Sequence, residues 1–429
     1  MNSSPSDLQK RPRLENHQQL PAGSYIPDDI LFDEILVRLP VRSLLRFRAV
    51  CEIWQEKIES KDFIQLHLKH HSLKKDSHLL LTHSNNNGYY RQAMSVMRIE
   101  ESGAASIEAV YSSPPHSCSL QTHKLDKFEM VAFCRGLVCA VASSRNSRLP
   151  QVIFVWNPFT GAHREFPYHV LKSGMELGVP SMSFAYDPIN DDYKIFVIGT
   201  SMDSDSPLHI EVFSLKNKSW RTLDATEDAE RPAGTRVGIT RTNLVASDDG
   251  DLYMGLTHYL APPGSKMFTI FKFNLSEERF SRYEAPPIPP VLYKGNYKLG
   301  LYKGSLCLYH MFGKSGESYG RNVDIWVSNS DESWSKVMHI SEEMSRENVP
   351  GHKWSRQRDQ AFDVGVVNSR FGVLHRSLQR NKLSKKTMWR RSLSVHDPED
   401  NNECRQILFD PLHEAYGADI LPTESLISP

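Results

Sequence analysis

The feature that most constrains this chain is a repeat in which a short apolar strand ends in an aromatic residue and a polar turn leads to a second aromatic. Four clear copies have the first aromatic at Trp156, Phe213, Phe273 and Trp326, separated by 57, 60 and 53 residues. The run Ile407-Leu408-Phe409 is a fifth, worn copy. A near-constant period of this length predicts an array of similar small β-sheets with the aromatics packed between neighbours.

From residue 78 onward, apolar residues recur with a period of two, and Gly, Pro, Asn and Asp separate the runs. The spacing is close to the roughly 50 residues of kelch repeats, so we expect an all-β, propeller-like domain of about five or six irregular blades. The step from Trp326 to Phe409 is 83 residues, which predicts an insertion there, with the basic stretch 376–391 as the candidate. Strands are predicted over His78–Thr82, Ala93–Ile99, Val131–Val141, Val152–Trp156, Tyr193–Ile198, Ile210–Leu215, Phe268–Phe273, Leu306–Tyr309, Val323–Val327, Val364–Val367, Phe371–Leu374 and Gln406–Phe409.

Residues 26–71 have a different character and predict a compact set of short helices. Pro27-Asp28-Asp29 suits a helix start, because proline fits the first turn and acids meet the positive end of the helix dipole. Pro40 would end that first helix. Asp62, with Gln65 three positions later, is the expected N-cap of the last helix. The chain therefore predicts a small helical module ahead of the β domain.

This helical module carries more large aliphatic residues than its interior can hold. Leu31, Ile35 and Leu39 recur at intervals of four, and the adjacent Leu44 and Leu45 must point in different directions. A module of about 45 residues gains only a few kcal/mol from its own core. Surplus apolar surface on such a module predicts a partner that covers it.

The motifs of the helical module resemble the F-box nearly end to end. They are Pro27-Asp28-Asp29, Arg38-Leu39-Pro40, the run 43–48 (Ser-Leu-Leu-Arg-Phe-Arg) and Val50-Cys51 followed by Trp54. Glu52 departs from the lysine that the family commonly has there, and we expect it to be exposed.

The β domain is similar to the F-box-associated, kelch-like domain that follows the F-box in many plant F-box proteins. The resemblance gives three expected regions: a disordered tail over 1–24, an F-box over 25–72 and the F-box-associated domain over 73–429. The motifs that carry it are Cys134–Cys139, Val155–Pro158, Tyr186–Pro188, Val212–Trp220, Val323–Trp334 and Glu424–Ser428.

The resemblance implies the substrate-recognition subunit of a Skp–cullin–F-box ubiquitin ligase, with no catalytic chemistry of its own. The F-box would bind a Skp-type adaptor and, through it, cullin and RING subunits, while the β domain would hold an unknown protein substrate. Helices that offer aliphatic side chains to a partner groove are a recurrent mode of recognition. The positions that match adaptor-facing or interface-supporting residues of the family are Pro27, Ile30, Leu36, Leu39, Pro40, Leu44, Leu45, Cys51 and Trp54.

The charge and the cysteine content of the chain argue against several classes of protein. Lys plus Arg and Asp plus Glu both number 51, so whole-chain charge attracts neither nucleic acid nor an anionic membrane. No apolar run approaches the roughly 20 residues that span a bilayer. The six cysteines form no C-x-x-C pair, and no secretory leader follows Met1, which predicts reduced thiols in the cytoplasm or the nucleus. A short import signal at 10–13 is an alternative to a solvated charge cluster.

No motif predicts a catalytic, metal or cofactor site. Cys134 and Cys139, five positions apart on one expected strand, would lie on opposite faces and pack in the core. Residues 248–251 (Asp-Asp-Gly-Asp) and the run 330–334 are expected to be blade turns. Two rival functions stay open: a binding module without ligase activity, and a propeller enzyme such as a glycosidase or an oxidase.

The basic residues of the stretch 376–391 allow several interpretations. They could bind an acidic substrate surface or RNA. Because Asp397, Glu399, Asp400 and Glu403 follow closely, we expect a solvated, partly disordered loop instead.

Overall fold

The computed structural model describes most of the helical module and the strands of the β domain. The expected tail over 1–24 lies outside the described residues. No helix in the described part is long and apolar enough to cross a membrane. The described residues are 26–72, 77–83, 93–99, 105–111, 127–144, 151–168, 181–199, 209–223, 236–238, 244–259, 266–288, 296–312, 322–340, 360–367, 370–380, 387–396, 398, 404–408, 415–421 and 427.

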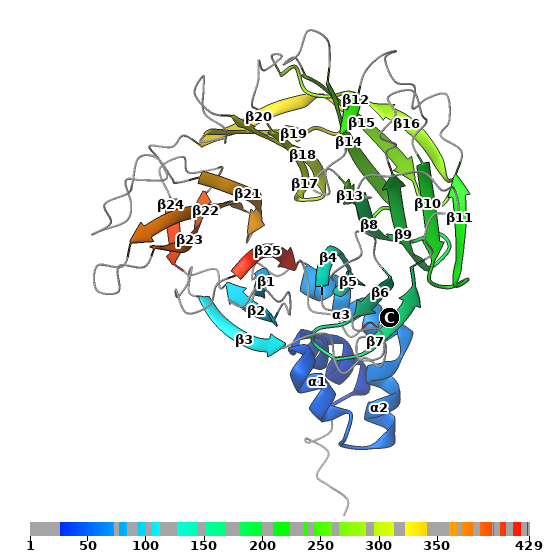
Figure 1. Cartoon of the computed structure of the whole chain (residues 1–429). Helices are drawn as coiled ribbons and strands as arrows, with labels where there is room; N and C mark the ends of the chain where they lie inside the picture. Colours follow the sequence, from blue (N-terminus) through cyan, green and yellow to red (C-terminus); the bar gives the residue numbers. More distant parts are fainter. Residues whose placement is uncertain are drawn as a thin grey trace, which may run out of the picture.

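Short helices form the N-terminal module, as the sequence predicts, and the remaining described elements are strands. Figure 1 shows these helices at one side of a ring of strands. In chain order they are η1 (Ile30–Ile35, a π-helix), η2 (Leu36–Arg38, a 3-10 helix), α1 (Val41–Phe47), α2 (Glu52–Glu59) and α3 (Lys61–Ser72).

The strands of the described residues form six antiparallel sheets, the blades of a propeller (Figure 1). Blade 1 contains β25 (Ala415–Leu421), β1 (Ser77–His83), β2 (Ala93–Ile99) and β3 (Ala105–Tyr111); blade 2 contains β4 (Lys127–Cys134), β5 (Leu137–Ser143), β6 (Val152–Trp156) and β7 (His163–Pro167); blade 3 contains β8 (Ser181–Asp187), β9 (Asp192–Gly199), β10 (His209–Ser214) and β11 (Ser219–Leu223). Blade 4 contains β12 (Arg236–Gly238), β13 (Leu244–Ala246), β14 (Asp251–Tyr259), β15 (Lys266–Asn274) and β16 (Arg279–Tyr283); blade 5 contains β17 (Asn296–Tyr302), β18 (Ser305–Phe312), β19 (Asn322–Ser328) and β20 (Trp334–Ile340); blade 6 contains β21 (Gln360–Val367), β22 (Arg370–Arg380), β23 (Thr387–His396) and β24 (Cys404–Leu408).

The ring is closed by its last strand. β25 pairs with β1 antiparallel, from His78 opposite Leu421 to His83 opposite Ala415, so the C-terminal strand completes the blade that the N-terminal strands begin. The inner strands contact one another around the centre: β4 contacts β8, β13 contacts β8 and β17, and β17 contacts β21. Closure leaves the ring without a free edge between its first and last blades, which removes a site for strand-to-strand aggregation.

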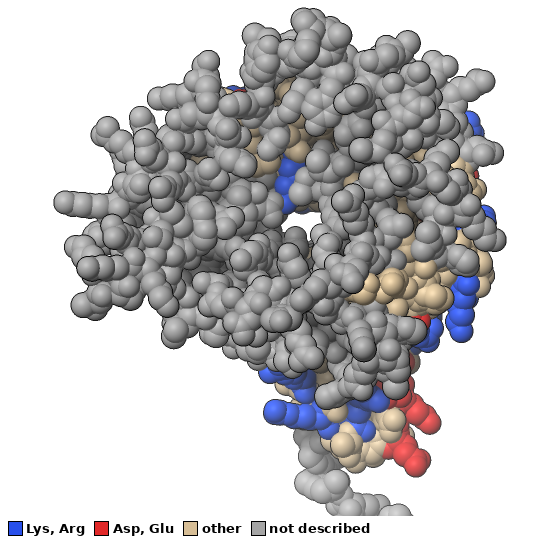
Figure 2. Space-filling view, viewed as in Figure 1, with Lys and Arg blue, Asp and Glu red and all other residues tan. Residues whose placement is uncertain are grey.

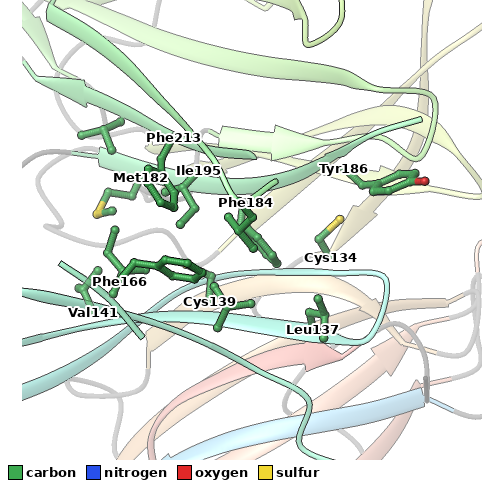
Figure 3. Packing of buried hydrophobic residues seen from close by; sticks show 14 of the residues in the cluster. Cys134, Leu137, Cys139, Val141, Phe166, Met182, Phe184, Tyr186, Ile195 and Phe213 are labelled. Carbon is green, nitrogen blue, oxygen red and sulfur yellow. The ribbon is translucent and has the colours of Figure 1, made fainter. Parts of the chain in front are cut away.

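The predicted repeat markers hold the blades together. Trp156, Phe213, Phe273 and Trp326 all lie on the third strand of their blade, and Phe213 and Phe273 are buried between sheets. Figure 3 shows this packing between blades 2 and 3, where aliphatic, aromatic and sulfur side chains of the two sheets meet. Burial of apolar surface at about 25 cal/mol per Å² makes such contacts the main stabilising force of the ring.

One predicted strand is in fact a hairpin. The sequence predicts a single strand over Val131–Val141, but β4 and β5 are separate strands joined by a turn at Arg135 and Gly136. Both turn residues are left-handed, with φ of 49° and 80°, as a tight two-residue turn requires. The opposite-face prediction for Cys134 and Cys139 is therefore wrong, because both pack in the same cluster, although their place in the core is confirmed.

The predicted insertion in the last repeat is wrong as well. The third strand of blade 6 is β23, whereas Ile407 and Leu408 belong to its fourth strand and Phe409 lies outside the described residues. Residues 376–380 and 387–391 of the basic stretch belong to β22 and β23 rather than to a loop. The 83-residue step arose because the copy was assigned one strand too late.

The two ends of the ring differ in their connections. Turns 135–136, 157–162 and 188–191 join neighbouring strands at the end that α3 contacts, which we call the near end. The other connections of each blade lie at the opposite end, the far end, because adjacent strands run antiparallel. In the sequence, 15 residues separate β3 from β4 and 19 separate β20 from β21, against six in the turn between β6 and β7.

Candidate functional site

The first helical segment of the module departs from an α-helix, and this decides which residues are buried. Its first turn closes when the backbone N–H of Leu31 donates to the Pro27 carbonyl at 2.9 Å. The segment continues as a π-helix and then a 3-10 helix. As a result Phe32 and Leu36 are buried, while Ile35, predicted on the same stripe as its neighbours at intervals of four, is 42% exposed.

The caps of the later helices also differ from the prediction. The last helix begins at Lys61 and not at Phe63, so its N-cap is Ser60 rather than Asp62. The Ser60 hydroxyl accepts a hydrogen bond from the backbone N–H of Phe63 at 3.3 Å, which satisfies one of the free donors of the first turn. Cys51 lies outside α1, on the extended residue before α2.

Aromatic side chains close the interior of the module. The Trp54 ring lies edge-on to Phe32 at 5.8 Å and to Phe47 at 5.7 Å between ring centroids. Phe63 of α3 meets Phe32 from the other side at 6.3 Å. These edge contacts tie three helices to the first segment, so the module has a packed core of its own.

The same module exposes large apolar side chains. The described residues include seven exposed large hydrophobic side chains, and six of them lie on the helical module. Ile53 is 64% exposed, Val50 is 58% exposed and Ile30 is 46% exposed, all without a cover from the chain itself. The six are Ile26, Ile30, Ile35, Val50, Ile53 and Leu66.

The residues predicted to form the binding interface fall into three groups. Pro27, Ile30, Pro40 and Cys51 are exposed; Leu39, Leu45 and Trp54 are partly buried; Leu36 and Leu44 are buried in the core of the module. Four of the nine positions therefore lie on the surface of the module. The two buried leucines belong to the core that supports this surface.

Sequence reasoning missed Ile53 and Leu66 as surface residues. On α2, Glu56 and Lys57 lie one helical turn after Ile53. On α3, Asp62 lies one turn before Leu66 and Lys69 one turn after it. An isolated aliphatic residue on an otherwise charged helix face is the signal that would have identified both.

Charges surround the module without covering its apolar residues. Figure 2 shows basic residues gathered on one side of the helices and acidic residues on another. Arg38 Nη2 contacts Glu34 Oε2 at 2.7 Å, and Arg48 pairs with Glu59. Exposed pairs of this kind contribute little to stability.

The last helix joins the module to the propeller through an apolar contact. Leu68 of α3 packs in the buried cluster between blades 2 and 3, and Ile64 contacts both that cluster and the core of the module. Phe159, in the β6–β7 turn, packs against the module from the propeller side. Ile427 shares the cluster with Leu68, and its carbonyl accepts a hydrogen bond from Asn157 Nδ2 at 2.9 Å.

Polar contacts surround this apolar junction. Arg135 Nη2 donates to Gln65 Oε1 at 2.9 Å, and its guanidinium lies 4.1 Å from the centroid of the Tyr186 ring. The Tyr186 hydroxyl donates to Asp191 Oδ1 at 2.6 Å, and Lys61 pairs with the same carboxylate. The hydrogen bond from Lys61 lowers the pKa of Asp191, so the ion pair is present at neutral pH. The helical module is thus fixed to the near end by both packing and charge.

The buried cysteine thiols of the propeller are not activated as nucleophiles. Burial raises the pKa of the Cys134 thiol and of the Cys307 thiol to about 12, and raises that of Cys139 further. Thiols of this kind are protonated at neutral pH and are poor nucleophiles. In the described part of the chain, no group of three His, Cys, Asp or Glu side chains is placed to hold a metal ion.

The comparison with protein families agrees with this architecture. Residues 24–66 match the F-box domain, and residues 78–397 match the F-box associated beta propeller domain. The chain belongs to the F-box proteins that carry an F-box-associated β-propeller. The helical module is therefore the F-box, and the propeller follows it along the chain.

Similar proteins are named as F-box proteins, some of them with kelch repeats. The F-box/kelch-repeat protein At3g23880 of Arabidopsis thaliana is 26% identical over 318 residues, 72% of this chain and 78% of that protein. F-box protein CPR1 of the same plant is 27% identical over 343 residues, 75% of this chain and 74% of that protein. Among solved structures, polysaccharide lyase Uly1 aligns at 11% identity with a TM-score of 0.40, over 66% of this chain and 72% of that one. A likeness that distant says nothing about activity.

Proposed function

We propose that this F-box protein is the substrate-recognition subunit of a Skp–cullin–F-box ubiquitin ligase. Its F-box docks on a Skp-type adaptor, which connects it to cullin and RING subunits, and its propeller recruits a protein target for ubiquitylation. The chain performs no covalent step itself. It raises the effective concentration of a target lysine near the charged conjugating enzyme.

The distribution of exposed apolar side chains is the observation that carries this proposal. Six of the seven exposed large hydrophobic side chains in the described residues lie on the F-box, although the F-box is a small fraction of the chain. Clustered apolar surface of this kind marks a protein–protein interface. The matched F-box family supplies the kind of partner, a Skp-type adaptor.

The two ends of the propeller support a division of labour. The near end is occupied by α3 and the tight turns that contact it. The far end carries the longer connections, and connections of this kind are where binding residues are most often found on a rigid scaffold. We therefore place target recruitment at the far end, on the side of the ring opposite the F-box junction.

The test is adaptor capture by surface variants of the full chain. The double variant Ile30→Glu with Ile53→Glu changes two exposed residues, so the protein should keep its unfolding temperature. It should lose adaptor affinity by at least about 30-fold, because a truncated hot-spot residue costs about 2 kcal/mol or more. Leu44 is not a suitable position for this test, because it is fully buried and a charge at that position would unfold the F-box.

The matched control is Ile189→Glu. Ile189 is 77% exposed in the β8–β9 turn of the propeller, so it tests whether any exposed isoleucine weakens capture. Capture should survive in this variant. Equal capture by the F-box double variant and the unmodified chain would refute adaptor docking. A chain that captures the adaptor but supports no ubiquitylation in a reconstituted complex would be a binding module without ligase activity.

A further inference from the structure

The basic stretch of blade 6 forms the outer part of a long hairpin. β22 pairs with β23 from Phe371 opposite His396 to Arg380 opposite Thr387. β21 pairs with β22 only as far as Arg376, and β24 pairs with β23 only as far as Ser392. In the described pairing, residues 377–380 and 387–391 therefore pair only with each other and extend beyond the four-stranded part of the blade.

The root of this hairpin is anchored in the propeller core. Phe371 and His396, opposite each other at the root, are both buried. Phe371 stacks on Tyr302 at 4.7 Å between ring centroids and meets Tyr309 edge-on at 6.2 Å. β22 and β23 are the second and third strands of their blade, so the paired strand ends Arg380 and Thr387 lie toward the far end. An anchored root gives the outer segment a defined place on that end.

The outer segment concentrates arginine. Arg376 lies directly opposite Arg391, Arg390 lies opposite Ser377, and Arg380 lies opposite Thr387. Like charges directly opposite each other destabilise a sheet. The sequence contains no Asp or Glu between Val364 and His396, so the hairpin does not supply its own counter-charge. An arrangement that costs local stability is expected at functional sites.

The acidic run follows the hairpin in the sequence, after His396 at the other end of β23. At about 3.3 Å per residue, His396 lies about 20 Å from Arg390 along the strand. That separation exceeds the Debye length of about 8 Å at physiological ionic strength. A charge at the His396 end of β23 is therefore largely screened from Arg390.

We propose that this arginine hairpin is a docking site for an acidic polypeptide segment of the recruited target. The proposal deepens the proposed function, on which it rests, by naming the chemistry of the target. Arginine presents a planar fork of donors that matches a carboxylate, and the free edges of a two-stranded hairpin can add an extended segment as a further strand.

A polypeptide fits this hairpin better than a nucleic acid. Between the arginine positions 376 and 380, Leu378 lies opposite Trp389, so one face alternates cationic and large apolar positions. That pattern complements a peptide that alternates acidic and apolar residues. Binding of nucleic acid by charge needs a broad basic surface, whereas this chain has no net charge.

The test uses the full chain in complex with its adaptor and a fluorescein-labelled peptide of twelve residues in which Glu and Leu alternate. Fluorescence anisotropy should show salt-sensitive binding. The variant Arg376→Gln with Arg391→Gln should bind at least about tenfold more weakly, about 1.4 kcal/mol. The variant Arg279→Gln with Arg282→Gln is the matched control, because both arginines are exposed on β16, and it should bind as the unmodified chain does.

Three results would overturn the proposal. They are no binding of the Glu-Leu peptide, equal binding by the hairpin variant, and equally tight, arginine-dependent binding of a twelve-nucleotide single-stranded RNA. Adaptor capture is followed in the same samples. Absence of peptide binding by the unmodified chain with intact adaptor capture therefore counts against the hairpin alone, whereas adaptor capture that the F-box variant retains in full counts against the ligase role.

Discussion

The two ends of the propeller differ in the connections between their strands. At the near end, side-chain oxygens hold the turns: the Asn157 oxygen accepts from the backbone N–H of Phe159 at 2.8 Å, and the Asn274 oxygen accepts from that of Glu277 at 2.8 Å. At the far end the connections are longer, and blade 6 places arginines opposite each other. Side-chain caps rigidify a turn, so the turns of the near end have a defined shape.

The interior of the near end also contains a buried ion pair. Lys194 Nζ lies 2.9 Å from Asp187 Oδ2, with both side chains almost fully buried, and donates to the Leu275 carbonyl at 2.6 Å. Burial acts to raise the pKa of Asp187, but hydrogen bonds from Ser276, Asn190 and Lys194 outweigh it and hold that pKa far below its usual range. The near end joins blades 3 and 4 by charge as well as by apolar packing.

Asp187→Ala should produce the largest change in stability. It leaves the Lys194 ammonium with only the more distant Glu278 carboxylate, 3.5 Å from Nζ. Breaking a buried pair by removing one partner costs about 3–5 kcal/mol, and we expect a loss at the lower end of that range. Urea unfolding of the full chain measures the loss. The exposed Asp249→Ala, in the β13–β14 turn of the same end, should change the free energy of unfolding by less than about 0.5 kcal/mol. Similar losses in both variants would show that the buried pair does not distinguish the near end.

The far end should respond to pH through a buried histidine. His310 stacks on Tyr297 at 5.0 Å and on Phe312 at 4.9 Å between ring centroids, and burial lowers its pKa to about 4. Between about pH 6.5 and 4 the unfolded chain binds a proton that the folded chain does not, so the free energy of unfolding falls as pH falls. The loss attributable to His310 should be on the order of 2 kcal/mol near pH 4.

Thermal unfolding at pH 7, 6 and 5 tests this prediction. His310→Phe keeps the stacked aromatic and should flatten the decline. The exposed His163→Gln on β7 should leave the decline as it is. His396 is also buried with a pKa lowered to about 4, so a smaller slope should remain in the single variant. An unchanged slope in His310→Phe would contradict the assignment.

The smallest expected effect has the opposite sign. Arg376→Gln removes one of two arginines that lie directly opposite each other, so it should raise the free energy of unfolding by about 0.2–1 kcal/mol. Arg279→Gln on β16 should change it less. A clear loss of stability in Arg376→Gln would mean that the hairpin arginines support the fold, and the functional interpretation of their placement would lose its basis.

The sequence was most informative where one residue type had one physical role. Trp156, Phe213, Phe273 and Trp326 recur because four consecutive blades carry a large aromatic on the third strand of their sheet, so period and fold class could be predicted. The turn between β4 and β5 could not be predicted, because Arg135 adopts a left-handed backbone conformation that is uncommon for arginine.

Charge misled the prediction for blade 6, and helix geometry misled it for the F-box. The stretch 376–391 was predicted as a loop because many basic residues favour solvent, yet most of it lies in β22 and β23. Leu44 could be recognised as part of an interface-forming motif, but its burial depends on the π and 3-10 turns that precede α1. Helix type of this kind depends on packing rather than on local sequence.

The cluster that Leu68 and Ile427 share has a consequence for the order in which the molecule is completed. Leu68 is synthesised early and Ile427 near the end of the described chain, yet both belong to one buried cluster. At about 5–20 residues per second, the F-box emerges on the order of tens of seconds before its last packing partner. Because β25 also closes the ring only at that stage, the nascent F-box can contact blades 2 and 3 before this shared cluster and the ring are complete.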